Sequence, residues 1–224
     1  MAEPQPPGGA APHFPRYALA YAPNPGTLGW LAGSHWLGRC AAQAQPMEQL
    51  RIEGIAPEAL HMLTAMPRQL GWRAAWVPDF ALAPGRDWLD LQHAVHHLAQ
   101  RLAPRPVPML QVRVHEGCLA LAPGPADAAH AELQAMAATC AQALQGIAAD
   151  AATATGAVTA PYLFHLPLTG PLHLVPAETQ TLVQEVAQDF FADLPPLRID
   201  SLALFSQASP HSDFVLLDHL ELRG

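Results

Sequence analysis

One histidine stands inside an apolar, strand-like stretch, residues 162–172, which reads YLFHLPLTGPL. The imidazole of His165 exchanges a proton near neutral pH, so it is a candidate acid–base group. Pro167 and Thr169 follow on the same face, since side chains alternate along a strand. Pro167 donates no backbone hydrogen bond, which confines such a strand to a sheet edge or a bulge. Thr169 is a candidate ligand contact, although about 13 Å of regular strand separates it from His165, a distance that a bulge at Pro167 would shorten.

An internal repeat places a second charged residue opposite His165. When the chain is shifted by 92 residues, residues 72–76 (WRAAW) fall on residues 164–168 (FHLPL), and two prolines of each half coincide. Each half then reads as a strand, a helix and a strand pair. We therefore interpret residues 70–123 and 162–222 as duplicated lobes of a single domain that spans residues 16–224.

The repeat also assigns faces to the two equivalent strands. If these strands face each other across a cleft, alternation puts Arg73, Ala75 and Val77 on one wall and the face that carries His165 on the other. The large apolar residues point the opposite way and are predicted to build the two cores: Trp72, Trp76, Phe164 and Leu168.

Strands and helices alternate along the chain and must position these residues. Periodicity and turn residues predict helices over 27–39, 57–66, 85–103, 126–146 and 176–194. Strands are expected over 16–23, 70–82, 107–123 (a pair around the turn His115-Glu116-Gly117), the stretch that opens the second half, and a closing pair within 198–222. The amphipathic helix 85–103 buries one face, formed by Trp88, Leu91, Val95, Leu98 and Leu102. This order predicts an α+β fold with largely antiparallel sheets.

Composition narrows the class of protein. Half of the 224 residues are apolar and the net charge is −8, which argues against nonspecific binding to nucleic acid or an anionic membrane. Three cysteines without a C-x-x-C pair suit a reduced, cytoplasmic setting. Residues 1–15 read as a disordered Pro/Gly leader without a signal-peptide core, and residues 147–160 as an Ala/Thr linker. We expect a monomer with no metal and no cofactor.

Several stretches resemble one known family. They are RYALAYAP (16–23), HWLGR (35–39), LTAMPRQLGWRAAWVPDF (63–80), FHLPLTGPL (164–172) and the closing SLALFSQ…FVLLDHLEL. Together they resemble the two-histidine phosphoesterase superfamily, and within it the bacterial family called domain of unknown function 1045, which is linked to phosphonate-utilisation genes. The resemblance implies two pseudo-symmetric α+β lobes around a central groove, with one His-x-Thr motif in each lobe.

Carried over position by position, this sequence keeps one of the four motif residues. His165 matches the second histidine, while Pro167 stands at its threonine. Arg73 stands at the first histidine, Ala75 at its threonine and Val77 at a lysine of the family. In the family one histidine takes a proton from the attacking oxygen and the other gives one to the leaving oxygen. An arginine cannot do this, because its pKa lies above about 12, but it can clamp a phosphoryl group.

Three functions follow from these departures. The first is a binding protein whose hydrolytic function is lost or severely reduced and which binds a small phosphorylated or phosphonate compound. The second is a divergent cyclic phosphodiesterase that uses His165 as acid–base group and Arg73 as phosphate clamp. The third is a protein-interaction module.

Other histidines read as ordinary surface residues. His93, His96 and His97 lie opposite the buried face of helix 85–103, which predicts a solvated helix face rather than a metal site. The stretch His115-Glu116-Gly117 reads as a turn, and His211 and Asp213 read as polar residues of a hairpin loop.

Overall fold

The computed structural model describes residues 14–124, 129–149 and 162–224. Most of the predicted leader and of the Ala/Thr linker lies outside these residues. Among the described residues there are six α-helices and several sheets, and every strand pair is antiparallel. The predicted α+β class with antiparallel sheets is confirmed.

The larger sheet joins the two ends of the chain. Among the described strands its order is β12-β11-β1-β4, and β5 also pairs with β1. β1 is central and almost wholly buried, with Leu19 opposite Leu204 of β11 and Ala18 opposite Phe205. The bounds are β1 Arg16–Tyr21, β4 Ala74–Ala75, β5 Phe80–Ala81, β11 Ser201–Gln207 and β12 Val215–Glu221.

The strand predicted over residues 70–82 is interrupted, because β4 and β5 both pair with β1 but in different registers. Ala20 pairs with Ala75 and Tyr17 pairs with Phe80, so three steps along β1 correspond to five steps along the partner. The two extra residues form a bulge around Pro78, which cannot donate to the ladder.

The smaller sheet has the order β7-β8-β9 among the described strands, which are Leu110–His115, Cys118–Pro123 and Leu166–Pro171. Glu116 and Gly117 close the β7–β8 hairpin with positive φ angles of 49° and 77°, the left-handed geometry of a two-residue hairpin turn. β9 is an edge strand within the described part of the chain, and its register against β8 shifts between Cys118 and Ala120. Pro167 therefore lies on an edge strand close to a bulge, as a proline in a strand requires.

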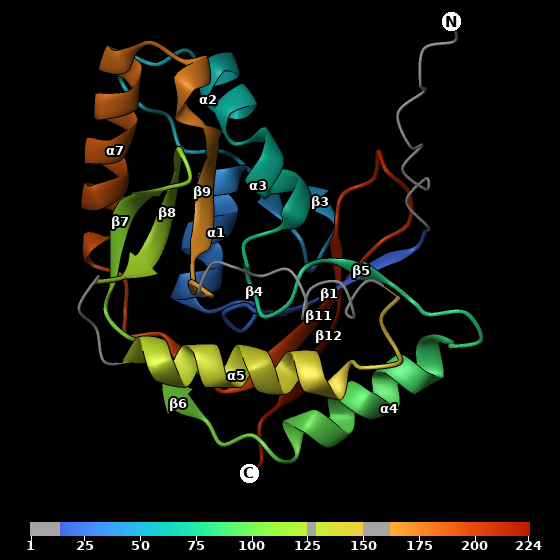
Figure 1. Cartoon of the computed structure of the whole chain (residues 1–224). Coiled ribbons are helices and arrows are strands. Elements are labelled where there is room, and N and C mark those ends of the chain that lie inside the picture. Colours follow the sequence, from blue (N-terminus) through green and yellow to red (C-terminus); the bar gives the residue numbers. More distant parts are fainter. Residues whose placement is uncertain (1–13, 125–128, 150–161) are drawn as a thin grey trace, which may run out of the picture.

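Helices cover both sheets (Figure 1). α7 packs against β7, α1 and α3 against β9, and α4 against β11 and β12. Their bounds are α1 Leu28–Leu37, α2 Pro57–Leu63, α3 Ala65–Leu70, α4 Trp88–Ala99, α5 Ala129–Ala143 and α7 Ala177–Ala192, with a 3-10 turn at Leu172–Leu174. No helix in the described residues is long and apolar enough to cross a membrane.

The remaining strands are two short pairs. One joins β2 (Arg39–Cys40) to β3 (Gln45–Pro46). The other joins β6 (Arg105–Pro106) to β10 (Arg198–Ile199), with Pro106 opposite Arg198.

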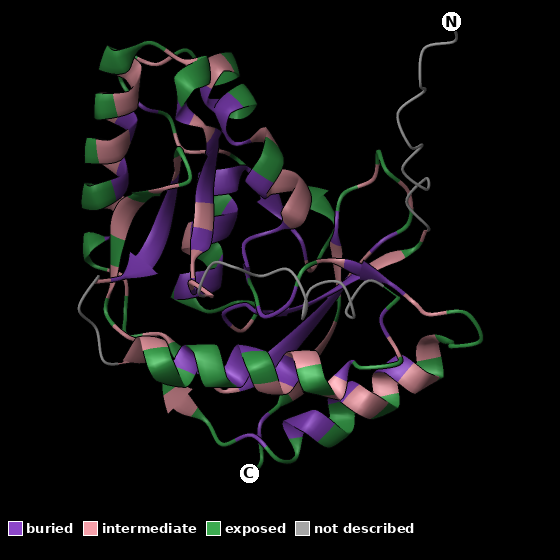
Figure 2. Cartoon of the chain, in the orientation of Figure 1, coloured by how far each residue is buried: buried purple, intermediate pink, exposed green. Residues whose placement is uncertain are grey.

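The large apolar residues predicted to build two cores lie instead in one, and the predicted alternation fails at Arg73 and Val77, which are also buried. Trp72, Trp76, Phe164 and Leu168 are all buried in one apolar cluster, and Figure 2 shows buried residues along β8 and β9 with exposed residues on the outer sides of the helices. The predicted buried face of α4 is confirmed for Leu91, Val95 and Leu98, and its helix begins at Asp87, which forms a capping box with Asp90.

Thr169 completes the bulge between β8 and β9. Its side chain is fully buried, and its Oγ1 accepts a hydrogen bond of 2.9 Å from the backbone N–H of Leu119, which is also buried. This hydroxyl therefore satisfies a donor at the point where the register of the ladder shifts.

Replacing Thr169 by valine keeps the shape of the side chain but leaves the N–H of Leu119 without this partner. We expect the free energy of unfolding to fall by about 1–3 kcal/mol. The same substitution at Thr181, exposed on α7, should change stability by about 0.5 kcal/mol or less. Urea unfolding of the two variants measures the difference, and equal effects would contradict this role for Thr169.

Candidate functional site

His165 lies just before β9 on the partly open face of the smaller sheet. Residues along this strand alternate: Phe164, Leu166 and Leu168 are buried, while His165 and Pro167 are partly exposed. The Nδ1 atom of His165 lies 2.9 Å from the backbone carbonyl oxygen of Leu163. A carbonyl only accepts, so Nδ1 carries the proton and Nε2 is left as the basic nitrogen.

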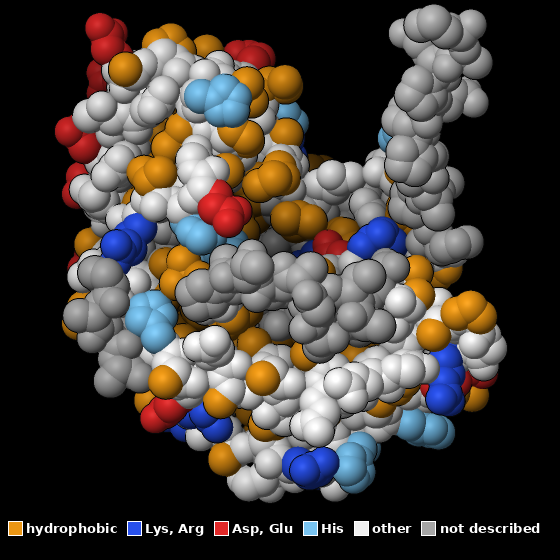
Figure 3. Space-filling view, in the orientation of Figure 1, with side chains coloured by type: hydrophobic (Ala, Val, Ile, Leu, Met, Phe, Trp, Pro, Cys, Tyr) orange, Lys and Arg blue, Asp and Glu red, His pale blue; other side chains and the backbone are white. Residues whose placement is uncertain are grey.

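A second histidine meets His165 on this face. The ring centroid of His115, the last residue of β7, lies 4.8 Å from that of His165, with an angle of 56° between the rings. Both side chains are partly exposed. Figure 3 shows histidine and acidic atoms side by side near the centre of the visible face. The turn predicted at His115 is confirmed, but the contact with His165 was not foreseen.

Burial decides the protonation of His165. It lowers the pKa of His165 below the usual value, and the neighbouring His115 lowers that pKa further. The carbonyl of Leu163 and the carboxylate of Glu116 act in the opposite direction but do not restore it. His165 is therefore neutral at neutral pH and presents a basic Nε2.

Arg73 is buried and forms an ion pair, unlike the partly exposed His165. Its side chain is 3% exposed, and Nη2 donates to both carboxylate oxygens of Asp79, at 2.8 and 2.9 Å. Burial lowers the pKa of Arg73 and raises that of Asp79, and in each case the partner's charge opposes the shift. Nη1 is buried and has no hydrogen-bond partner among the described residues. The bulge around Pro78 is what brings Asp79 to this guanidinium.

Two aromatic rings cover the guanidinium of Arg73. Its Cζ lies 4.1 Å from the ring centroid of Phe214 and 5.1 Å from that of Phe205. Phe205 comes from β11 and Phe214 from the loop that joins β11 to β12. Cation–π contact of this kind stabilises a desolvated arginine, and it also removes Arg73 from solvent.

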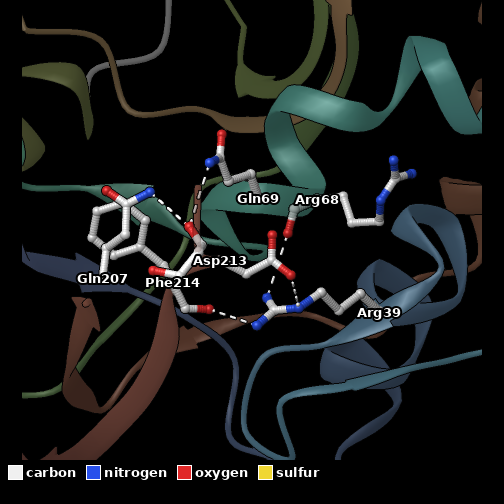
Figure 4. A network of polar contacts seen from close by, with 7 residues as sticks. Arg39, Arg68, Gln69, Gln207, Asp213 and Phe214 are labelled. Atoms are coloured by element: carbon white, nitrogen blue, oxygen red, sulfur yellow. Dashed lines mark hydrogen bonds and ion pairs between the residues drawn. The ribbon is translucent and has the colours of Figure 1, made fainter. Parts of the chain in front are cut away.

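A polar network holds the β11–β12 loop in place (Figure 4). Arg39 donates from Nη2 to the carbonyl of Phe214 at 2.9 Å, and its Nε lies 3.0 Å from the carboxylate of Asp213. Gln207 donates to the carbonyl of Ser212 at 2.8 Å, and the N–H of Phe214 donates to the carbonyl of Gln69 at 2.8 Å. Asp213, predicted to be a simple loop residue, is thus part of the clamp that keeps Phe214 over Arg73.

The two segments that carry the motif positions do meet, although β4 and β9 belong to different sheets. The hydroxyl of Tyr162 donates to the carbonyl of Ala75 at 3.1 Å, and the rings of Tyr162 and Trp76 stack with centroids 6.0 Å apart. The structure does not bring Arg73 and His165 into contact within the described residues. His165 is partly exposed, whereas Arg73 and Thr169 are buried.

The other candidates from the sequence stay at the surface. His93, His96 and His97 are exposed on α4, as predicted, and His211 is exposed in the β11–β12 loop. Among the described residues no group of three or more His, Cys, Asp or Glu side chains is arranged to hold a metal ion. Sequence reasoning missed the roles of Asp79, Phe214 and Arg39, although all three lie in stretches that carry the family resemblance.

Comparison with known proteins identifies the family. Residues 76–160 and 156–215 match the model of the family described as "Protein of unknown function (DUF1045)", which together is more than half of the chain. The chain belongs to the DUF1045 family. The matched region of this DUF1045 protein includes Trp76, Asp79, His115 and His165, while Arg73 lies just before it.

One curated protein is similar over a shorter stretch. It is the ribose 1,5-bisphosphate phosphokinase PhnN of Janthinobacterium sp. (strain Marseille), 40% identical over 70 residues. The match covers 31% of this chain and 16% of that protein, so the chain spans about a sixth of its length.

We expect the buried pair Arg73–Asp79 to contribute more to the free energy of unfolding than an exposed ion pair does. Asp79→Asn leaves a buried guanidinium without its counter-charge, and we expect a loss of about 3–5 kcal/mol in the free energy of unfolding. Glu132→Gln, which removes the 70% exposed partner of Arg105, should cost about 1 kcal/mol or less. Adding Arg73→Met to Asp79→Asn should recover part of the loss. Equal losses for Asp79→Asn and Glu132→Gln in urea unfolding would contradict this account.

Proposed function

We propose that this protein binds a small phosphorylated or phosphonate compound on the open face around His165, and that phosphodiester hydrolysis is lost or severely reduced. The observation that carries the proposal is the contrast between the two motif positions. His165 is partly exposed, with a fixed tautomer and a basic Nε2. Arg73, at the other position, is buried and paired with Asp79.

The chemistry of a two-histidine phosphoesterase needs one group that takes a proton and another that gives one. Arg73 cannot serve as either, because it does not release its proton near neutral pH. Losing one such group costs about 100- to 10,000-fold in rate. Ala75 and Pro167 also lack the hydroxyls that would hold phosphoryl oxygens. A site of this composition retains the means to bind a phosphoryl group rather than to cleave its ester.

The arrangement of elements supports two related lobes. The first half has the order β4, β5, α4, β6, β7 and β8, and the second has β9, the 3-10 turn, α7, β10, β11 and β12, so the elements correspond except that β5 stands where the turn does. Pro106 and Arg198, which are 92 residues apart and thus equivalent in the repeat, pair directly with each other in β6 and β10. A two-fold axis that relates the two halves and passes between β6 and β10 would place equivalent residues of the two strands opposite each other.

The ligand class is supported by the similarity to PhnN, a weak link to phosphonate metabolism. That relative is named for a phosphorylated sugar, which is the kind of compound we propose for this chain. A cytoplasmic location belongs to the same proposal and is supported by three unpaired cysteines, Cys40, Cys118 and Cys140.

Exposed apolar side chains favour protein interaction as a second candidate function. Met62 is 74% exposed and Met66 43% exposed, and Figure 3 shows hydrophobic side chains gathered over α2 and α3. Methionine-rich surfaces adapt to partners, so a protein docked there is the alternative if no small ligand binds.

Hydrolysis and binding can be measured separately. With 2′,3′-cyclic and 1,2-cyclic phosphodiesters we expect no turnover above that of the His165→Ala variant. In a thermal-unfolding screen of phosphates, phosphonates and nucleotides, a ligand present at about 100 times its dissociation constant should stabilise the protein by about 2.7 kcal/mol. This gain should disappear in His165→Ala and persist in His97→Ala, an exposed histidine on α4.

Two outcomes would overturn the proposal. Robust turnover that is lost in His165→Ala would make the protein a phosphodiesterase that uses His165 without Arg73 as a clamp, because Arg73 is buried. Ligand stabilisation that survives in His165→Ala would place the binding site elsewhere.

A further inference from the structure

We propose that His115 and His165 act as one anion-binding pair, which holds a phosphoryl or phosphonyl group and takes up one proton when it binds. The inference rests on the proposed function and names the residues that meet the ligand. It assigns His115 a role that its position in a hairpin turn does not suggest.

Each histidine of the pair is positioned by the backbone next to it. His165 is oriented by the carbonyl of Leu163, and His115 directly precedes the tight turn of Glu116 and Gly117. With ring centroids 4.8 Å apart, one ligand oxygen group can reach both imidazoles. Within the described residues no hydrogen bond is made by Nε2 of His165 or by either ring nitrogen of His115. These nitrogens are therefore available to a ligand.

The face of the sheet that carries the pair is apolar at two positions, while Arg113 of β7 lies opposite Ala120 on that face and two residues before His115. Pro167 of β9 pairs with Ala120 of β8, and neither side chain carries a hydrogen-bonding atom. Partial burial beside these two apolar side chains weakens hydration and strengthens a charge-assisted hydrogen bond to an anion.

Charges around the pair decide when it becomes protonated. The charged or titratable groups beside it are Arg113, two residues before His115 on β7, Glu116 in the turn, and the thiol of Cys118, whose pKa is raised by burial and by Glu116. At neutral pH His165 is uncharged, because burial and the nearby His115 oppose its protonation. A bound anion stabilises a protonated imidazole beside it, so binding draws a proton from solvent onto the pair. Two protonated rings at this separation would repel each other, which limits the uptake to one proton.

Glu116 competes with the ligand. Its negative charge acts on His165 from the turn and would repel an incoming anion. Removing this charge should therefore strengthen anion binding, the opposite of the effect expected at His115. Two neighbouring substitutions with opposite effects are difficult to explain by a general loss of structure.

Calorimetric titration of the full chain with inorganic phosphate and with methylphosphonate tests the pair. At about pH 8, measured in two buffers of different ionisation enthalpy, wild-type protein should take up about one proton per ligand. His115→Gln should weaken binding by about tenfold or more, since it removes a charge-assisted hydrogen bond. Glu116→Gln should strengthen binding, and His173→Gln, an exposed histidine beyond β9, should leave it unchanged.

A second measurement needs no ligand. In an NMR titration of the imidazole resonances, His115→Gln should raise the pKa of His165 and Glu116→Gln should lower it further. If the pKa of His165 does not move in His115→Gln, the histidines are not coupled and the inference is wrong.

The calorimetric outcomes separate the inference from the proposed function. Phosphate binding that is equal in wild type and His115→Gln, without proton uptake, overturns the pair and leaves the proposed function standing. If the wild type binds no phosphate, phosphonate or phosphorylated compound, the proposed function and the pair both fail.

Discussion

A buried guanidinium must have a partner, and the pairing of Arg73 with Asp79 organises one half of this molecule. Asp79 reaches Arg73 because two extra residues bulge out between β4 and β5 around Pro78. The cost of desolvating the charge is offset further by the rings of Phe205 and Phe214. Phe214 in turn depends on Arg39, which holds its carbonyl, and on the bonds that keep its loop in place. One charge in the interior thus links β1, β4, β11 and the loop before β12.

The two halves consequently present different chemistry to solvent. On the side of Arg73 the rings of Phe205 and Phe214 cover the guanidinium, and its unpaired Nη1 is buried. On the side of His165 the strand lies at a sheet edge, and a second imidazole approaches from a hairpin turn. The two histidines therefore meet beside a single sheet, and the buried Arg73 does not join them.

The local pattern of residues along strands, helices and turns was sufficient to predict several features of the fold. The faces of residues 164–168, the buried face of α4 and the hairpin turn at Glu116 and Gly117 depend on neighbours a few residues away, and the structure has them as expected. The burial of Arg73 depends on Phe214, far along the chain, and its partner Asp79 depends on a bulge that the sequence shows only as a proline. The contact between His115 and His165 depends on how β7 and β8 bend over β9, which local patterns do not encode.

Pairing of the chain ends has a consequence for how the protein folds. β1 begins at Arg16, which pairs with Gln207 of β11, and β9 pairs with β8 from the other half of the repeat. Each sheet therefore combines strands from distant parts of the chain, so neither half of the repeat can complete its own sheet. Contacts between residues so far apart in sequence close large loops, which slows folding. During synthesis β1 can pair early with β4 and β5, but its edge toward β11 stays unpaired until nearly the whole chain has emerged, and during that period the protein is most exposed to aggregation.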